Sequence, residues 1–167
     1  MNTNEDWQRE VHLVFSIPEE YCEIKQTVGC FMHIHVAPMQ TTDLDQKYAM
    51  VQLQIILNVI SYYDAAITQI MPAEGRTIYR PTPTSRRSRK PLFFILEKIK
   101  MKPMVYREMG QDKYQSWNFG HLTNQCGNIE FRRPPGVQTA ADAKPWTAYT
   151  LSFINMAITM SIGWAKV

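Results

Sequence analysis

The sequence predicts an α+β fold in which an antiparallel sheet carries the functional site on one face and two long helices pack against the sheet. Residues 29–38 and 128–133 alternate apolar and polar side chains as strands do, whereas residues 44–71 and 142–163 repeat apolar side chains at helical spacing. The strands mostly follow one another without an intervening helix. At 167 residues, 45% of them hydrophobic and 20% charged, the chain is expected to form a single domain over residues 1–167.

The charges and cysteines exclude several classes of protein. The net charge is only +3, and its excess is local, in the basic stretch at residues 86–90, so a nucleic-acid partner is not predicted. The three cysteines, Cys22, Cys30 and Cys126, form no CxxC unit, which argues against a disulfide framework and a structural zinc site. No leader or membrane span is recognised. We therefore expect a cytoplasmic protein without a nucleic-acid or membrane partner.

The first strand is predicted at residues 11–17, with Pro18 ending it. One face of this strand would carry Val11, Leu13, Phe15 and Ile17. The longest helix is predicted at residues 44–71, which contain neither glycine nor proline, with Asp43 among its capping residues. Its apolar stripe would consist of Tyr48, Val51, Ile55, Val59, Tyr63, Ala66, Ile67 and Ile70.

The second half of the chain begins with a predicted basic, proline-rich loop at residues 72–91. A short helix at residues 92–100, ended by Lys102-Pro103, and a short strand at residues 116–122 should follow. Asp142 is the expected N-cap of the last helix, and Gly163 its expected stop. The apolar stripe of this helix would consist of Trp146, Tyr149, Phe153, Met156, Ala157 and Met160.

Two histidines are the first candidates for chemistry. In a strand over residues 29–38, His33 and His35 lie on one face, roughly 6.5–7 Å apart at the backbone, while Ile34 and Val36 face the core. Such a pair could converge on one ion or one phosphate, or the two could be ordinary surface histidines. Imidazole suits zinc or iron, whereas magnesium prefers oxygen ligands.

Glu130 and Arg132 are the second pair of candidates, since they share one face of the strand at residues 128–133. A glutamate can hold a divalent cation while an arginine holds phosphate or carboxylate oxygens, as chemistry on a nucleotide phosphate requires. An ion pair across the sheet is the simpler alternative for Glu130. Arg76, just after the long helix, could reach a phosphate or could be an exposed charge.

Several stretches resemble the amidoligase family of fungi, relatives of glutamine synthetase and glutamate–cysteine ligase. Cys30-Phe31-Met32-His33-Ile34-His35-Val36 is similar to the family's Cys-Gly-x-His-Val-His-Val strand, and Asn128-Ile129-Glu130-Phe131-Arg132-Arg133-Pro134-Pro135-Gly136-Val137 is similar to its Thr-Ile-Glu-Phe-Arg-x-Pro-Pro-Gly-Val. Tyr114 to Phe119, Thr139-Ala140-Ala141-Asp142-Ala143 and Trp146 continue the match. The resemblance covers about residues 27–160, the C-terminal portion of the family domain.

The resemblance implies an ATP-dependent carboxylate–amine ligase that uses ATP and Mg²⁺ and acts on small-molecule or peptide carboxylates and amines. His33 or His35 would contact ATP phosphates or the metal, Glu130 would ligate the metal, Arg132 would steady the transferred phosphate, and Arg76 would be a weaker phosphate ligand.

The family's upstream Glu-x-Glu strand has no counterpart before Gly29, and Phe31 stands at a usual glycine. A truncated copy that could be inactive is therefore expected, with an exposed sheet edge that a homo-oligomer or another chain could cover. Two other functions stay open. The chain could be a non-catalytic remnant or interaction module that keeps the fold, or a transition-metal-binding protein that uses the two histidines and Glu130.

Overall fold

The computed structural model describes residues 6–27, 29–38, 47–73, 76, 100–109, 114–124 and 127–164. Its elements in chain order are α1 (Asp6–Tyr21), β1 (Ile34–Val36), α2 (Met50–Ile70), α6 (Lys102–Met109), β2 (Trp117–Asn118), the 3₁₀ helix η1 (Gly120–Thr123), β3 (Ile129–Phe131) and α7 (Ala140–Trp164). The α+β class is thereby confirmed. The predicted loop at residues 72–91 and helix at residues 92–100 lie almost entirely outside the described residues.

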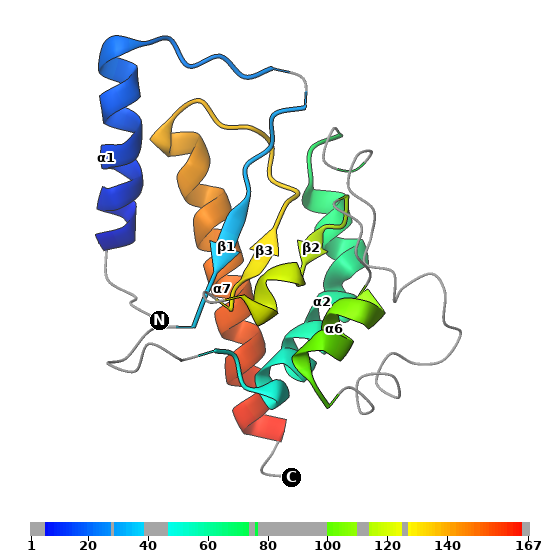
Figure 1. Ribbon diagram of the computed structural model, residues 1–167. Helices are drawn as coiled ribbons and strands as arrows, with labels where there is room; N and C mark the ends of the chain where they lie inside the picture. Colours follow the sequence, from blue (N-terminus) through cyan, green and yellow to red (C-terminus); the bar gives the residue numbers. More distant parts are fainter. Residues whose placement is uncertain are drawn as a thin grey trace.

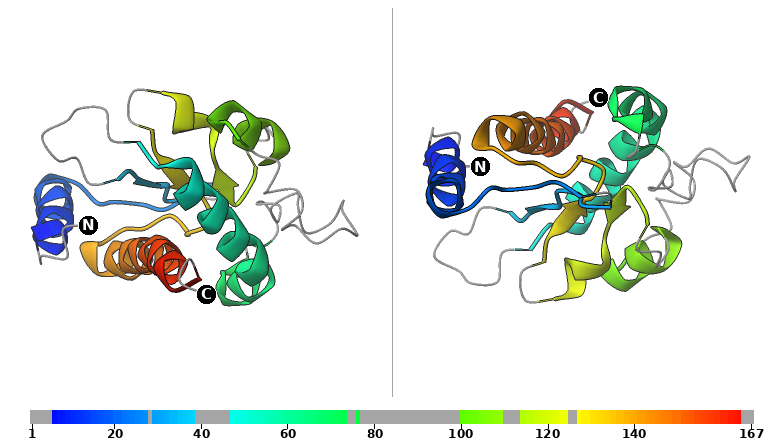
Figure 2. Two further views of the ribbon diagram at one scale, coloured as in Figure 1. Left: turned by 90° about the horizontal axis from the view of Figure 1, so that it is seen from below. Right: turned by 90° about the horizontal axis from the view of Figure 1, so that it is seen from above.

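The three strands form an antiparallel sheet in the order β1-β3-β2. Helices α2 and α7 lie on one side of the strands, and η1 and α6 lie on the other side (Figures 1 and 2). Helix α1 stands beside the β1 edge and packs against α7 (Figure 1). The sheet therefore has a face covered by the two long helices and an opposite face bordered by η1.

The covered face is held by an aromatic cluster. Trp117 of β2 and Phe131 of β3 have ring centroids 4.4 Å apart, and the ring of Phe153 on α7 lies 5.5 Å from that of Trp117. All three side chains are buried. Fully burying an aromatic side chain contributes on the order of 1.5–3 kcal/mol, so this cluster fixes α7 firmly against the sheet.

The prediction of a strand at residues 11–17 was wrong, because these residues belong to α1. Trp7, Val11 and Phe15 are spaced four residues apart and are half-buried, while Leu13 is 59% exposed. The apparent alternation therefore divides between two sides of a helix. Pro18 does not end the element, since the helix continues to Tyr21.

The long helix begins later than predicted and buries a different face. Residues 47–49 precede it without helical structure, and the predicted cap at Asp43 lies outside the described residues. The Gln52 side chain accepts a hydrogen bond from the Ala49 N–H at 2.8 Å, which satisfies one donor at the helix start. Val51 and Ile70 of the predicted stripe are exposed. The buried residues of α2 are Leu53, Ile56, Leu57, Ile60, Asp64 and Ile67.

A helix that is apolar on nearly every side explains this error, because periodicity then cannot select the buried face. By length and composition alone, α2 is also the one helix in the described part of the chain that could cross a membrane. The same composition is expected of a core helix, and one face of α2 is completely buried here.

Two other predicted boundaries also move. Lys102-Pro103 begins α6, since proline fits a first helical turn that needs no N–H partner, and the helix predicted before it lies outside the described residues. Thr139 caps α7, because its hydroxyl oxygen accepts the Asp142 N–H at 3.1 Å. Asp142 therefore lies one turn inside the helix, which continues past Gly163.

Candidate functional site

Glu130 occupies the centre of the sheet face that α2 and α7 leave uncovered. It is the middle residue of β3, opposite His35 of β1 on one side and Asn118 of β2 on the other. Its neighbours Ile129 and Phe131 point into the core and are completely buried. The alternation of the strand therefore sends one carboxylate to the opposite face, where polar groups surround it and leave its side chain only 2% exposed.

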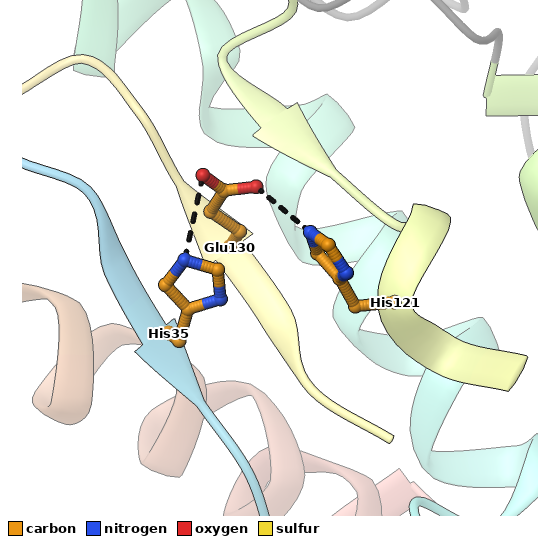
Figure 3. Close-up of side chains that lie close together, drawn as sticks. All are labelled: His35, His121 and Glu130. Atoms are coloured by element: carbon orange, nitrogen blue, oxygen red, sulfur yellow. Dashed lines mark ion pairs between the residues drawn. The ribbon is translucent and has the colours of Figure 1, made fainter. Parts of the chain in front are cut away.

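Three imidazoles contact the two oxygens of this carboxylate. His33 Nδ1 lies 2.9 Å from Glu130 Oε1, His35 Nε2 lies 3.5 Å from the same oxygen, and His121 Nε2 lies 3.5 Å from Oε2. His35 and His121 approach from opposite sides, one from β1 and one from η1 (Figure 3). Their rings are 5.4 Å apart between centroids. One carboxylate thus connects two neighbouring imidazoles, His33 and His35, with a third, His121, from a distant part of the chain.

Arg132 and Asn118 complete the surroundings of Glu130. Arg132 Nη2 lies 2.9 Å from Oε2, and Asn118 Nδ2 donates a hydrogen bond to the same oxygen at 2.7 Å. Burial acts to raise the pKa of Glu130, but the hydrogen bonds from Asn118 and Arg132 outweigh it and lower that pKa below its ordinary value. The carboxylate is therefore ionised at neutral pH.

His33 contacts the carboxylate as a neutral imidazole. Burial lowers the pKa of His33 below its usual 6.5, the nearby charges of Arg132 and His35 lower it further, and the attraction of Glu130 opposes these effects. At neutral pH the 2.9 Å contact is therefore a hydrogen bond in which Nδ1–H donates to Glu130.

The two more distant imidazoles have side-chain amides behind them. His35 Nδ1 lies 3.2 Å from Asn128 Oδ1, and His121 Nδ1 lies 3.2 Å from Asn124 Nδ2. In both rings Nδ1 is thus engaged on the outer side and Nε2 is directed at Glu130. An outer partner of this kind fixes the orientation of a ring and selects its tautomer.

The local fold around Asn118 explains how His121 reaches the cluster. Asn118 Oδ1 accepts the N–H of Gly120 at 2.9 Å, which closes a tight turn directly after β2. That turn leads into η1, whose second residue is His121. The same side chain therefore holds Glu130 with its nitrogen and starts the turn that carries His121 with its oxygen.

The structure brings together four of the five residues singled out from the sequence: His33, His35, Glu130 and Arg132. Arg76 does not join them, because its Nε donates to the carbonyl of Met71 at the end of α2. The predicted strand at residues 116–122 consists of β2 followed by η1, and His121 was not predicted as a site residue. The sequence Asn118-Phe119-Gly120 was the available signal, since asparagine two residues before glycine favours a turn.

The donor atoms of the cluster suit some metal ions better than others. One atom each from His35, His121 and Glu130 lies within 4.8 Å of the other two. Among the described residues no second carboxylate joins this group. Two imidazoles and one carboxylate match the ligands preferred by zinc, iron and related ions, whereas magnesium requires mainly oxygen ligands and does not fit this set.

Comparisons with protein-family models, with curated proteins and with solved structures found no match to this chain.

Proposed function

We propose that the face of the sheet around Glu130 is the phosphate-binding site of an ATP-dependent carboxylate–amine ligase. The observation that carries this proposal is the gathering of His33, His35 and Arg132 around the Glu130 carboxylate. These are the residues that the resemblance to amidoligases assigns to ATP phosphates, metal and the transferred phosphate. They come from two segments about 95 residues apart, and they meet because β1 pairs with β3.

The electrostatics of the site support an anionic ligand. Arg132 carries a fixed positive charge with several N–H donors, and the imidazoles of His35 and His121 can add one N–H donor each. Phosphoryl transfer depends mainly on positioning and on stabilising negative charge, and it requires no nucleophilic side chain. A preorganised ring of such donors is consistent with this chemistry.

The proposed reaction has two steps. The substrate carboxylate attacks the γ-phosphorus of ATP, which breaks the bond between the γ-phosphorus and the bridging oxygen and releases ADP. The substrate amine then attacks the acyl phosphate, the carbon–oxygen bond to phosphate breaks, and the amine gives up a proton as the amide forms. In the first step Arg132 would orient the transferred phosphoryl group by hydrogen bonds.

A hydroxamate assay tests this function. Wild-type protein is incubated with ATP, a panel of amino acids and short peptides as carboxylates, and hydroxylamine as the amine. Divalent magnesium, manganese or zinc is added in separate reactions. We expect ADP release that depends on the carboxylate and on hydroxylamine, together with formation of a hydroxamate. The Arg132→Gln variant should lose at least tenfold in rate, because it removes the charge that orients the phosphoryl group.

The control is Arg107→Gln, a change at an exposed arginine on α6. Binding of ATP by the wild type, measured by isothermal titration, separates two alternatives. ATP binding without hydroxamate formation would favour a non-catalytic nucleotide-binding remnant. No ATP binding with any of the three metals would overturn the proposal.

A further inference from the structure

We propose that His35, His121 and Glu130 form a binding site for a divalent transition-metal ion of the zinc class. This inference concerns the same face of the sheet as the ligase proposal but does not depend on it, because it requires neither ATP nor turnover. It assigns a ligand role to His121. It also replaces magnesium, which the donor set does not fit, with an ion that binds imidazole.

The distances distinguish the ligand histidines from His33. His33 Nδ1 lies 2.9 Å from Glu130, the usual length of an N–H···O hydrogen bond. His35 Nε2 and His121 Nε2 both lie 3.5 Å from a carboxylate oxygen, which is longer than such a bond. Two ligand atoms bound at tetrahedral angle to one zinc ion, each at about 2.1 Å, are separated by about 3.4 Å. The two longer contacts have this length, with His35 reaching Oε1 and His121 reaching Oε2, so a shared ion would be held through both oxygens of the carboxylate. One atom from each of the three residues lies within 4.8 Å of the other two.

The outer contacts of both rings resemble those of metal-bound histidines. A ligating imidazole usually engages its second ring nitrogen with a carboxylate, carbonyl or water, and loss of that contact weakens binding about 10–100-fold. His35 Nδ1 lies 3.2 Å from the Asn128 oxygen. His121 Nδ1 lies equally close to the Asn124 amide, which can present its oxygen to an N–H by turning over. Both Nε2 atoms would then offer a lone pair to the ion.

The site is also open to solvent on one side. The side chains of His35 and His121 are 43% and 37% exposed, whereas that of Glu130 is 2% exposed. An ion could enter between the imidazoles and meet the ionised carboxylate below them. Three protein ligands leave a fourth position open, as in catalytic zinc sites. With Arg132 2.9 Å from the carboxylate, that position favours an anionic oxygen from a carboxylate or phosphate.

The test is titration of the metal-free protein with Zn²⁺ in the absence of nucleotide, monitored by calorimetry, with Co²⁺ absorption as a second readout. We expect one ion per chain. The His121→Ala variant should bind Zn²⁺ at least tenfold more weakly and should lose the visible absorption of tetrahedral Co²⁺. His12→Ala is the matched control, since His12 is an exposed histidine on α1.

Thermal melting of each metal-free variant shows whether it folds. If His121→Ala unfolds, His121→Gln replaces it, because glutamine keeps polarity and length but lacks an imidazole. Zinc affinity of the His121 variants equal to that of the wild type would overturn the proposal, and so would a wild type that binds no Zn²⁺. A wild type that binds Zn²⁺ but forms no hydroxamate would support the metal site and count against the ligase.

Discussion

Arg132 and Arg133, the two residues directly after β3, each form an ion pair with a carboxylate, but on opposite faces of the sheet. Arg132 turns to the open face and lies 2.9 Å from Glu130, among exposed imidazoles. Arg133 turns to the covered face, where it is completely buried and its Nη1 lies 3.9 Å from Asp64 on α2. Both pairs join an arginine to a carboxylate, but only the first is within reach of a ligand.

The two ion pairs also differ in how completely their charged groups are hydrogen-bonded. Glu130 receives several short polar contacts on both oxygens. Arg133 donates one hydrogen bond to the Thr68 hydroxyl at 2.8 Å, and its Nε and Nη2 have no hydrogen-bond partner within the part of the chain that the structure describes. A buried guanidinium is costly without full pairing, so the Arg133–Asp64 pair connects α2 to the sheet at an energetic cost. We interpret the Asp64 pair as structural and the Glu130 cluster as functional.

The largest predicted effect on stability comes from breaking the buried pair. In Asp64→Leu the Arg133 charge stays buried without its carboxylate, which should lower the free energy of unfolding by about 3–5 kcal/mol. Urea denaturation followed by circular dichroism measures this change. Zinc affinity of the folded protein should stay within about threefold of the wild type.

The double variant Asp64→Leu with Arg133→Met is the control for this prediction. It replaces both charges by apolar side chains of similar volume, which is often neutral or stabilising for a buried ion pair. We expect it to recover most of the lost stability. A double variant as unstable as Asp64→Leu would show that the pair is not a separate structural unit.

A smaller effect, on both stability and zinc affinity, is predicted for Asn118→Ala, which changes the Glu130 cluster. The variant removes a 2.7 Å hydrogen bond to an ionised carboxylate and the acceptor for Gly120 N–H. We expect a loss of about 1.5–3 kcal/mol in stability. Zinc affinity should fall about tenfold, because the turn that carries His121 is no longer fixed.

Asn155→Ala provides the matched control for this change, since Asn155 is exposed on α7. Calorimetry with Zn²⁺ and urea denaturation are measured on both variants. If Asn118→Ala loses stability but keeps full zinc affinity, then Asn118 supports the sheet alone and does not position the site.

Sequence reasoning found the centre of the site because strand alternation is a strict rule. Once residues 128–133 were interpreted as a strand, Glu130 and Arg132 had to share a face, and His33 and His35 followed in the same way. The pairing of these strands is a long-range contact, but the shared apolar backing of Ile34, Val36 and Ile129 made a common sheet the natural expectation.

The same reasoning missed features that depend on tertiary packing. His121 reaches Glu130 only because a side chain, Asn118, closes the turn after β2, and no periodic pattern records such a contact.

Residues 11–17 were misassigned because an apolar residue at every second position also occurs in a helix with two apolar sides. Phe15 lies on the half-buried side of α1, and Leu13 lies on its exposed side. The buried face of α2 was misassigned for a related reason, since apolar side chains occupy more than one side of this helix and the sequence pattern does not say which of them is buried.

The smallest predicted effect is the pH dependence of stability that the Glu130 cluster contributes. The pKa of His33 is lower in the folded protein than its ordinary 6.5, so the unfolded chain binds the proton more readily. Stability should therefore be fully present above about pH 6.5 and should decline as the pH falls below that value. The pKa of Glu130 is likewise lowered from 4.5, so a second decline begins near pH 4.5.

Urea denaturation of the metal-free protein from pH 7.5 to 3.5 measures both declines. His33→Asn should flatten the first decline and Glu130→Gln the second. A first decline that survives in His33→Asn would assign it to a group other than His33. Arg132 contacts Glu130, which is hydrogen-bonded to the titrating His33, whereas Arg133 on the covered face has no such link among the described residues. In that case, therefore, the difference between Arg132 and Arg133 would no longer explain the loss of stability in acid.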